Sequence, residues 1–253
     1  MTPSLFYILL FILGASLGSF LSVPIHRIHT GDKGILLGKS ACPHCNKKLK
    51  AKELVPIFSY IFQGGKCRKC KGKISWHYPV LELSTGLLFL AMALFHFQPL
   101  PLYLFYVLVL IFIFFYDLLY KEIPDVVMLP VVILAFVATF HPDTVSVLDG
   151  LLGAGTLLLF FLLQIVISKG QWLGGGDLRI GAFMGLILGF KLMLLAVFFS
   201  YLIGAIVSIG LLMSGKVTRK TMIAFGPFLV LGTLVAFFYG DFLIDWYLNL
   251  VLL

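Results

Sequence analysis

The feature that most constrains the fold is a series of long apolar runs. Stretches such as residues 3–25 and 145–167 reach the length of about 20 residues that a helix needs to cross a bilayer. Charged residues make up only 12% of the chain, whereas soluble domains carry about 25%. A parallel-sheet core would also give apolar runs, but these would be shorter, about 4–8 residues each. The pattern therefore predicts an all-α fold, a polytopic membrane helical bundle.

The spacing of the runs predicts about eight transmembrane helices. The first run lacks a basic start and is longer than the apolar region of a signal peptide, so we expect it to be a retained span. We predict a first transmembrane helix at 1–25, a hydrophilic loop at 26–78 and a transmembrane bundle at 79–253. The expected spans are 3–25, 79–97, 101–117, 124–140, 145–167, 177–190, 191–213 and 223–248.

The hydrophilic loop is strongly basic. Twelve of the nineteen Lys and Arg residues lie between Arg27 and Lys73. Basic loops stay on the cytoplasmic side of a membrane, and they also attract anionic lipids. We therefore expect a multi-pass membrane protein with this loop in the cytoplasm. Topology and lipid attraction explain the charge without a nucleic-acid partner, and we predict none.

All four cysteines lie in this loop. Cys42, Cys45, Cys67 and Cys70 form two C-x-x-C pairs separated by 21 residues, a spacing typical of zinc sites. Four thiolates give a closed, tetrahedral, structural site, and a loop of this size needs such a staple to fold. A redox pair and free thiols remain as alternatives, although a reducing cytoplasm disfavours disulfides. We expect His44 to be a bystander.

Two aspartates stand at the ends of expected spans. Asp117 ends the third span, and Asp177 begins the sixth, directly after Gly174, Gly175 and Gly176. With the basic loop inside, both lie at the cytoplasmic ends of their helices. Two neighbouring carboxylates can share a proton and so provide a base that activates water and an acid that protonates a leaving amine. Asp177 could instead cap its helix, whereas we expect no cap role for Asp117, because a helix C-terminus disfavours an anion.

In this order, the motifs resemble the bacterial type IV prepilin peptidases, which are intramembrane aspartyl proteases of the GxGD type. The resemblance covers nearly the whole chain and rests on five segments. These are "GASLGSFLSVPIHRI", the cysteine loop from "CPHC" to "YPVLEL", "YDLLYKEIPD" with its D-x6-PD pattern, "GGGDLRIGAFMGLILG" and "FGPFLVLG". The chain departs from the family at Ser22, where Asn is usual, and at Arg179, where Lys is usual.

The resemblance implies both a mechanism and a substrate. It makes Asp117 and Asp177 the catalytic pair, Gly174 and Gly176 the GxGD glycines, and the four cysteines the zinc ligands. We also expect Gly174, Gly176 and Arg179 to bind substrate. The family cleaves the basic leader from prepilins and pseudopilins at the cytoplasmic face of the bacterial inner or plasma membrane, where the resemblance therefore places this chain. Many members then methylate the new N-terminus with S-adenosylmethionine. The alternatives are a peptidase without methyl transfer, a cation-coupled transporter that uses the two aspartates, and a membrane-anchored zinc module.

Overall fold

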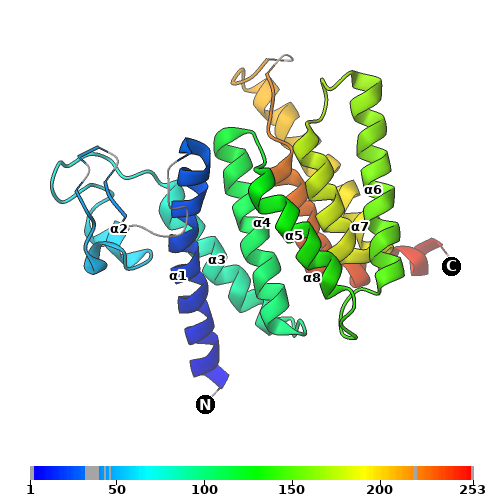
Figure 1. The fold of residues 1–253 in the computed structure, drawn as a ribbon, viewed down its shortest axis with the longest axis horizontal. Coiled ribbons are helices and arrows are strands. Elements are labelled where there is room, and N and C mark those ends of the chain that lie inside the picture. The colour runs from blue at the N-terminus through cyan, green and yellow to red at the C-terminus, as the bar shows by residue number, and fades with distance from the viewer. Residues whose placement is uncertain (1–2, 32–39, 43, 46, 219–220, 252–253) are drawn as a thin grey trace. The chain divides into compact units, whose positions relative to one another are not determined.

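The prediction of an all-helical membrane fold is confirmed. A computed structural model describes residues 3–31, 40–42, 44–45, 47–218 and 221–251, so residues 32–39 of the expected loop lie outside the described residues. The described residues form eight α-helices and one short 3-10 helix, with two isolated β-bridges and no strands (Figure 1). The chain divides into two compact units, residues 1–115 and 116–253, and each is described by itself.

The first unit is built on a pair of long apolar helices, α1 and α3. Glycines let the two helices approach closely: a Cβ on Gly14 would lie 2.8 Å from the ring of Phe89, and one on Gly86 would lie 2.9 Å from the ring of Phe11. Small residues are the usual means by which membrane helices pack. The unit contains α1 (Pro3–Thr30), η1 (Ala51–Glu53), α2 (Phe58–Phe62), α3 (His77–Leu94) and most of α4 (Leu100–Tyr120).

The second unit packs three helices around α7. Gly185 of α7 meets the backbone of Gly153 and Ala154 in α6, and Gly232 of α8 meets the backbone of Ala196 in α7. The unit takes in the last turn of α4, and its own helices are α5 (Asp125–Ala138), α6 (Val147–Ser168), α7 (Gly175–Met213) and α8 (Gly226–Val251).

Of the described helices, six are long and apolar enough to cross a membrane by length and composition alone, and each of the eight expected spans falls on a helix. The run at 124–140 forms α5, which has only 14 residues. The runs at 177–190 and 191–213 form the two parts of α7, which meet at a kink at Gly189, where φ is +72°, so the division expected near residue 190 is present. Oδ1 of Asp149 accepts a hydrogen bond from the Phe190 N–H at 3.2 Å and so caps the helix where it restarts.

Candidate functional site

Asp117 lies in the last turn of α4 and is buried, with 6% of its surface exposed. Its Oδ2 accepts a hydrogen bond from the backbone N–H of Gly226 at 2.8 Å. Gly226 begins α8, and the first N–H groups of a helix have no partner within the helix. The expectation that Asp117 has no cap role holds for its own helix only, because its carboxylate lies at the positive end of α8.

Asp177 lies in the first turn of α7 and is half-buried. Its Oδ2 accepts a hydrogen bond from the N–H of Gly174 at 3.0 Å, as the third residue of a capping box does. The carboxylates of Asp117 and Asp177 are close enough for their charges to interact. The structure thus brings together two acidic residues that are far apart in sequence, and each also caps a helix.

Two glycines, Gly226 and Gly176, lie where the helices that carry Asp117 and Asp177 pack against neighbouring segments. A Cβ on Gly226 would lie 2.6 Å from Oδ2 of Asp117 and 3.2 Å from Cδ1 of Ile180, which is in the second turn of α7. A Cβ on Gly176 would lie 2.8 Å from Cγ1 of Ile123, in the segment between α4 and α5. The end of α4 and the starts of α7 and α8 therefore converge around the two carboxylates, with no room for a side chain at either glycine.

The neighbouring glycines of the GGGD stretch are less constrained. A Cβ on Gly174 would meet only Asp177, at 3.9 Å, and one on Gly175 would meet nothing within 4 Å. Of the two glycines that we predicted to bind substrate, Gly176 thus packs against protein, and Gly174 supplies an N–H group to Asp177.

Arg179 is held by an ion pair. Its Nη2 lies 2.7 Å from Oδ2 of Asp125, which is the first residue of α5. Its Nη1 also donates to the Gly175 carbonyl at 3.4 Å. The pair joins the first turns of α5 and α7, and its side chains keep 32% (Arg179) and 53% (Asp125) of their surface exposed.

Tyr201 and Gln164 were not singled out by sequence reasoning. The hydroxyl of Tyr201 in α7 donates to Oε1 of Gln164 in α6 at 2.9 Å, and Tyr201 is close enough to Asp177 for their charges to interact. The Tyr201 ring lies 5.0 Å from that of Phe225, the residue before Gly226. A polar residue within an apolar span, such as Gln164, is the signal that could have indicated this pair.

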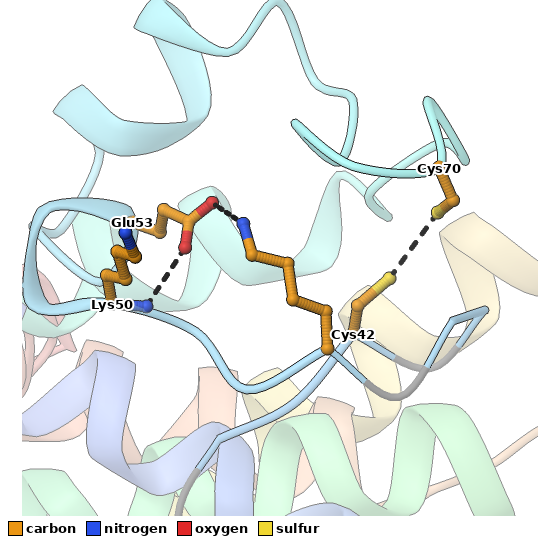
Figure 2. A network of polar contacts seen from close by, with 5 residues as sticks. Cys42, Lys50, Glu53 and Cys70 are labelled. Carbon is orange, nitrogen blue, oxygen red and sulfur yellow. Dashed lines mark hydrogen bonds and ion pairs between the residues drawn. The ribbon is translucent and has the colours of Figure 1, made fainter.

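The four cysteines form a separate cluster in the first unit. Their sulfurs all lie within 4.8 Å of one another, and those of Cys42 and Cys70 are 3.8 Å apart (Figure 2). Four sulfurs bound to one zinc ion at about 2.3 Å would be about 3.8 Å apart, so this arrangement fits a tetrahedral metal ion. Backbone N–H groups of Cys70 and Lys69 lower the pKa of the Cys67 thiol to about 6, which favours the thiolate that binds metal.

The two knuckles have the same backbone design. Cys42 donates its N–H to the Lys47 carbonyl at 3.0 Å, and Cys67 donates to the Gly72 carbonyl at 2.9 Å. His44 lies between the first pair of cysteines, and its Nε2 is 3.3 Å from the carbonyl oxygen of Lys73.

Buried Glu53 ties the first knuckle to the loop that follows it. One carboxylate oxygen accepts from Lys47 Nζ at 2.7 Å, and the other accepts from the Lys50 N–H at 2.9 Å (Figure 2). These bonds, from Lys47 first and then from Lys50, lower the pKa of Glu53. The ionised side chain therefore stabilises the turn at the base of the knuckle.

Glu82 in α3 is a buried acidic residue whose role the sequence left open. Its Oε2 accepts from the Ile57 N–H at 2.6 Å, and Ser19 of α1 also donates to the carboxylate. Ile57 has a φ of +64°, and the Phe58 N–H bonds back to the Pro56 carbonyl at 2.6 Å, which makes a γ-turn. Glu82 thus joins α1, α3 and the start of α2.

The fold and this set of residues define a class of protein: a helical multi-pass membrane protein with two acidic residues at converging helix ends and a cysteine cluster that could hold a metal ion. Residues 12–96 match the bacterial peptidase A24 N-terminal domain, and residues 104–209 match the type IV leader peptidase family. The chain belongs to the type IV leader peptidase family, which confirms the resemblance drawn from its motifs.

Relatives match the chain over nearly its whole length. It is 34% identical to a prepilin leader peptidase/N-methyltransferase of Bacillus subtilis (strain 168), over 96% of this chain and 98% of the relative. It is 30% identical to proteins of the same name from Aeromonas hydrophila and Pseudomonas aeruginosa, in both cases over 98% of this chain and 95% of the relative. No solved structure matches the chain.

Proposed function

We propose that this chain removes the basic leader peptide from type IV prepilins or pseudopilins and then methylates the new N-terminus. The observation that carries the proposal is the meeting of Asp117 and Asp177 at the converging ends of α4, α7 and α8. The names of the relatives agree with both activities.

The proposed peptidase reaction uses one aspartate as base and the other as acid. The ionised carboxylate takes a proton from water, and the water oxygen attacks the scissile carbonyl carbon. The protonated carboxylate hydrogen-bonds the developing oxyanion and then supplies the proton that the leaving amine needs when the C–N bond breaks. Burial of Asp117 limits competing water and strengthens these interactions.

The proposed partners and cofactors follow from the same family membership. The substrate is a prepilin whose apolar segment lies in the bilayer, with its leader junction at the cytoplasmic face. Cys42, Cys45, Cys67 and Cys70 would hold a structural zinc ion that stabilises the loop. S-adenosylmethionine would supply the methyl group, and this part of the proposal rests on the relatives' names and the motif resemblance. The basic loop would orient the site toward the cytoplasm.

The test is cleavage of a purified prepilin by purified Asp117→Asn and Asp177→Asn proteins in lipid vesicles. Each substitution keeps the side-chain shape and removes the ionisable group, so we expect leader release to be lost. Asp241→Asn, at an exposed position of α8, is the matched control and should cleave like wild type. Full cleavage by either site variant would contradict the proposed pair.

Three further measurements test the other activities and the zinc site. Labelled S-adenosylmethionine in the same assay reports methylation. If no label enters the cleaved prepilin, the protein is a peptidase without methyl transfer. If no leader is released by the wild type but a cation gradient across the vesicles collapses, the two aspartates serve transport. Metal analysis of wild type against Cys67→Ser tests the zinc site, because loss of one of four ligands should release the ion.

A further inference from the structure

The loop of the first unit carries an apolar surface that its own fold leaves uncovered. In α2, Phe58, Ile61 and Phe62 are 59%, 63% and 79% exposed. Their spacing of i, i+3 and i+4 puts them on one face of the helix, and the Phe58 and Phe62 rings stack 6.4 Å apart. We call this surface the α2 face. Exposed apolar groups that are contiguous mark an interaction site.

Tyr60 shows that the opposite side of α2 faces the loop. Tyr60 is half-buried, and its hydroxyl would lie 3.1 Å from a Cβ on Gly65, the residue that closes the turn after α2. The helix therefore has a side packed on its own loop and a side, the α2 face, that is turned away from it.

The hydrogen bond between Glu82 and the Ile57 N–H sets the depth of the α2 face relative to the bilayer. α3 has 18 residues, so its length of about 27 Å is slightly less than the thickness of a hydrocarbon core, about 30 Å. Its first residue, His77, must then lie close to the membrane boundary, and Glu82 lies about 7 Å further along the helix. Because the Ile57 N–H is bonded to Glu82, α2 starts within about 7 Å of the boundary.

The charges around the α2 face complement a lipid surface. The loop presents basic side chains that are exposed on both sides of α2 in the sequence, and exposed Trp76 stands directly before α3. Trp is enriched where a helix enters the headgroup layer. Aromatic and aliphatic side chains flanked by Lys and Arg are typical of segments that lie in the membrane interface. The exposed basic residues are Lys48, Lys50, Lys52, Lys66, Arg68, Lys69, Lys71 and Lys73.

We propose that the α2 face inserts into the headgroup layer of the bilayer that the chain spans, with the basic residues of the loop on anionic phospholipids. The burial of Phe58, Ile61 and Phe62 in lipid would remove their apolar surface from water. The strained turn at Ile57 is held by Glu82, so the face is presented at a fixed depth rather than by a free loop. This contact is independent of the peptidase reaction.

The test uses the full-length protein with a single tryptophan. Trp76, Trp172 and Trp246 are exposed, and each is replaced by Phe to give a background without tryptophan. Phe62→Trp then reports on the α2 face, and Tyr60→Trp, two residues away on the loop side, is the matched control. Both proteins are placed in phosphatidylcholine vesicles with or without phosphatidylglycerol, and some of the lipids carry bromine near the headgroup end of the acyl chain.

We expect bromolipid to quench the tryptophan at position 62 and leave the one at position 60 nearly unquenched, with stronger quenching in vesicles that contain phosphatidylglycerol. Equal quenching at both positions would overturn the proposal. The proposal would also be overturned if the tryptophan at position 62 were protected from quenching by aqueous acrylamide but were not quenched by bromolipid. A second copy of the chain would then cover the α2 face. Leader cleavage measured on the same vesicles shows whether the tryptophan-free background is functional, so a failed peptidase proposal can be told apart from a failed lipid contact.

Discussion

The backbone N–H of Gly226 donates a hydrogen bond to Oδ2 of Asp117 across 2.8 Å, although the two residues are 109 positions apart in the chain. The bond explains how a carboxylate can stand at the C-terminal end of α4, where that helix's own dipole disfavours it. The start of α8 offers unpaired N–H groups and the opposite end of a dipole. Asp117 is therefore positioned by α8 as much as by α4.

This relationship predicts a severe effect for Gly226→Ala. The added Cβ would lie 2.6 Å from Oδ2 of Asp117, so the carboxylate must move. A displacement of about 1 Å at a catalytic group can cost about 100-fold in rate, and we expect a loss of that order in leader cleavage. The matched control is Gly210→Ala in α7, where a Cβ meets nothing within 4 Å and activity should stay at the wild-type level. Wild-type kcat in Gly226→Ala would show that Asp117 does not need this position.

Two of the three glycines before Asp177, Gly175 and Gly176, should differ in their tolerance of alanine. Gly176→Ala would force a Cβ against Cγ1 and Cβ of Ile123, whereas Gly175→Ala adds a methyl group in open space. We expect Gly176→Ala to lower cleavage at least about 10-fold by shifting the first turn of α7, and Gly175→Ala to leave it unchanged. Ile123→Ala combined with Gly176→Ala should recover part of the loss, because it removes the clashing atoms. Equal loss in both single variants would instead indicate a peptide that approaches the backbone at Gly175.

The sequence predicted the parts of this molecule that depend on local pattern. Apolar runs predicted helices, C-x-x-C spacing predicted the sulfur cluster, and "GGGD" placed Asp177 at a helix start. Contacts between segments that are far apart in the chain leave no comparable pattern in the sequence. Nothing near Asp117 in the sequence indicates Gly226, and nothing near Glu82 indicates Ile57.

The division of α7 shows what hydropathy alone leaves open. The apolar runs at 177–190 and 191–213 predicted two helices, and the kink at Gly189 divides α7 near that point. The hydrogen bond from the Phe190 N–H to Asp149 of α6, which caps the second part of α7, has no signal in the local sequence.

Arg179 and Asp125 should behave as a coupled pair. Exposed ion pairs contribute about 0.2–1 kcal/mol, so neither Arg179→Gln nor Asp125→Asn should unfold the protein. If the pair positions the first turn of α7, each single variant lowers kcat, and the swap Arg179→Asp with Asp125→Arg restores part of it. If Arg179 binds substrate instead, as the sequence led us to predict, Arg179→Gln raises KM and the swap does not restore it. A double-mutant cycle on kcat and KM separates the two roles.

Glu53 should stabilise its turn in a pH-dependent way. Its folded-state pKa is lowered from an ordinary value of 4.5, so its contribution is fully present above that value and is lost as the pH falls through the folded-state pKa. We expect faster hydrogen exchange at the Lys50 amide in Glu53→Gln than in wild type at neutral pH, and the difference should close in acid. Lys47→Met should show part of the same effect, whereas Lys48→Met, the same change at the next, exposed residue, should not. Identical exchange in wild type and Glu53→Gln at neutral pH would mean that the turn does not depend on this carboxylate.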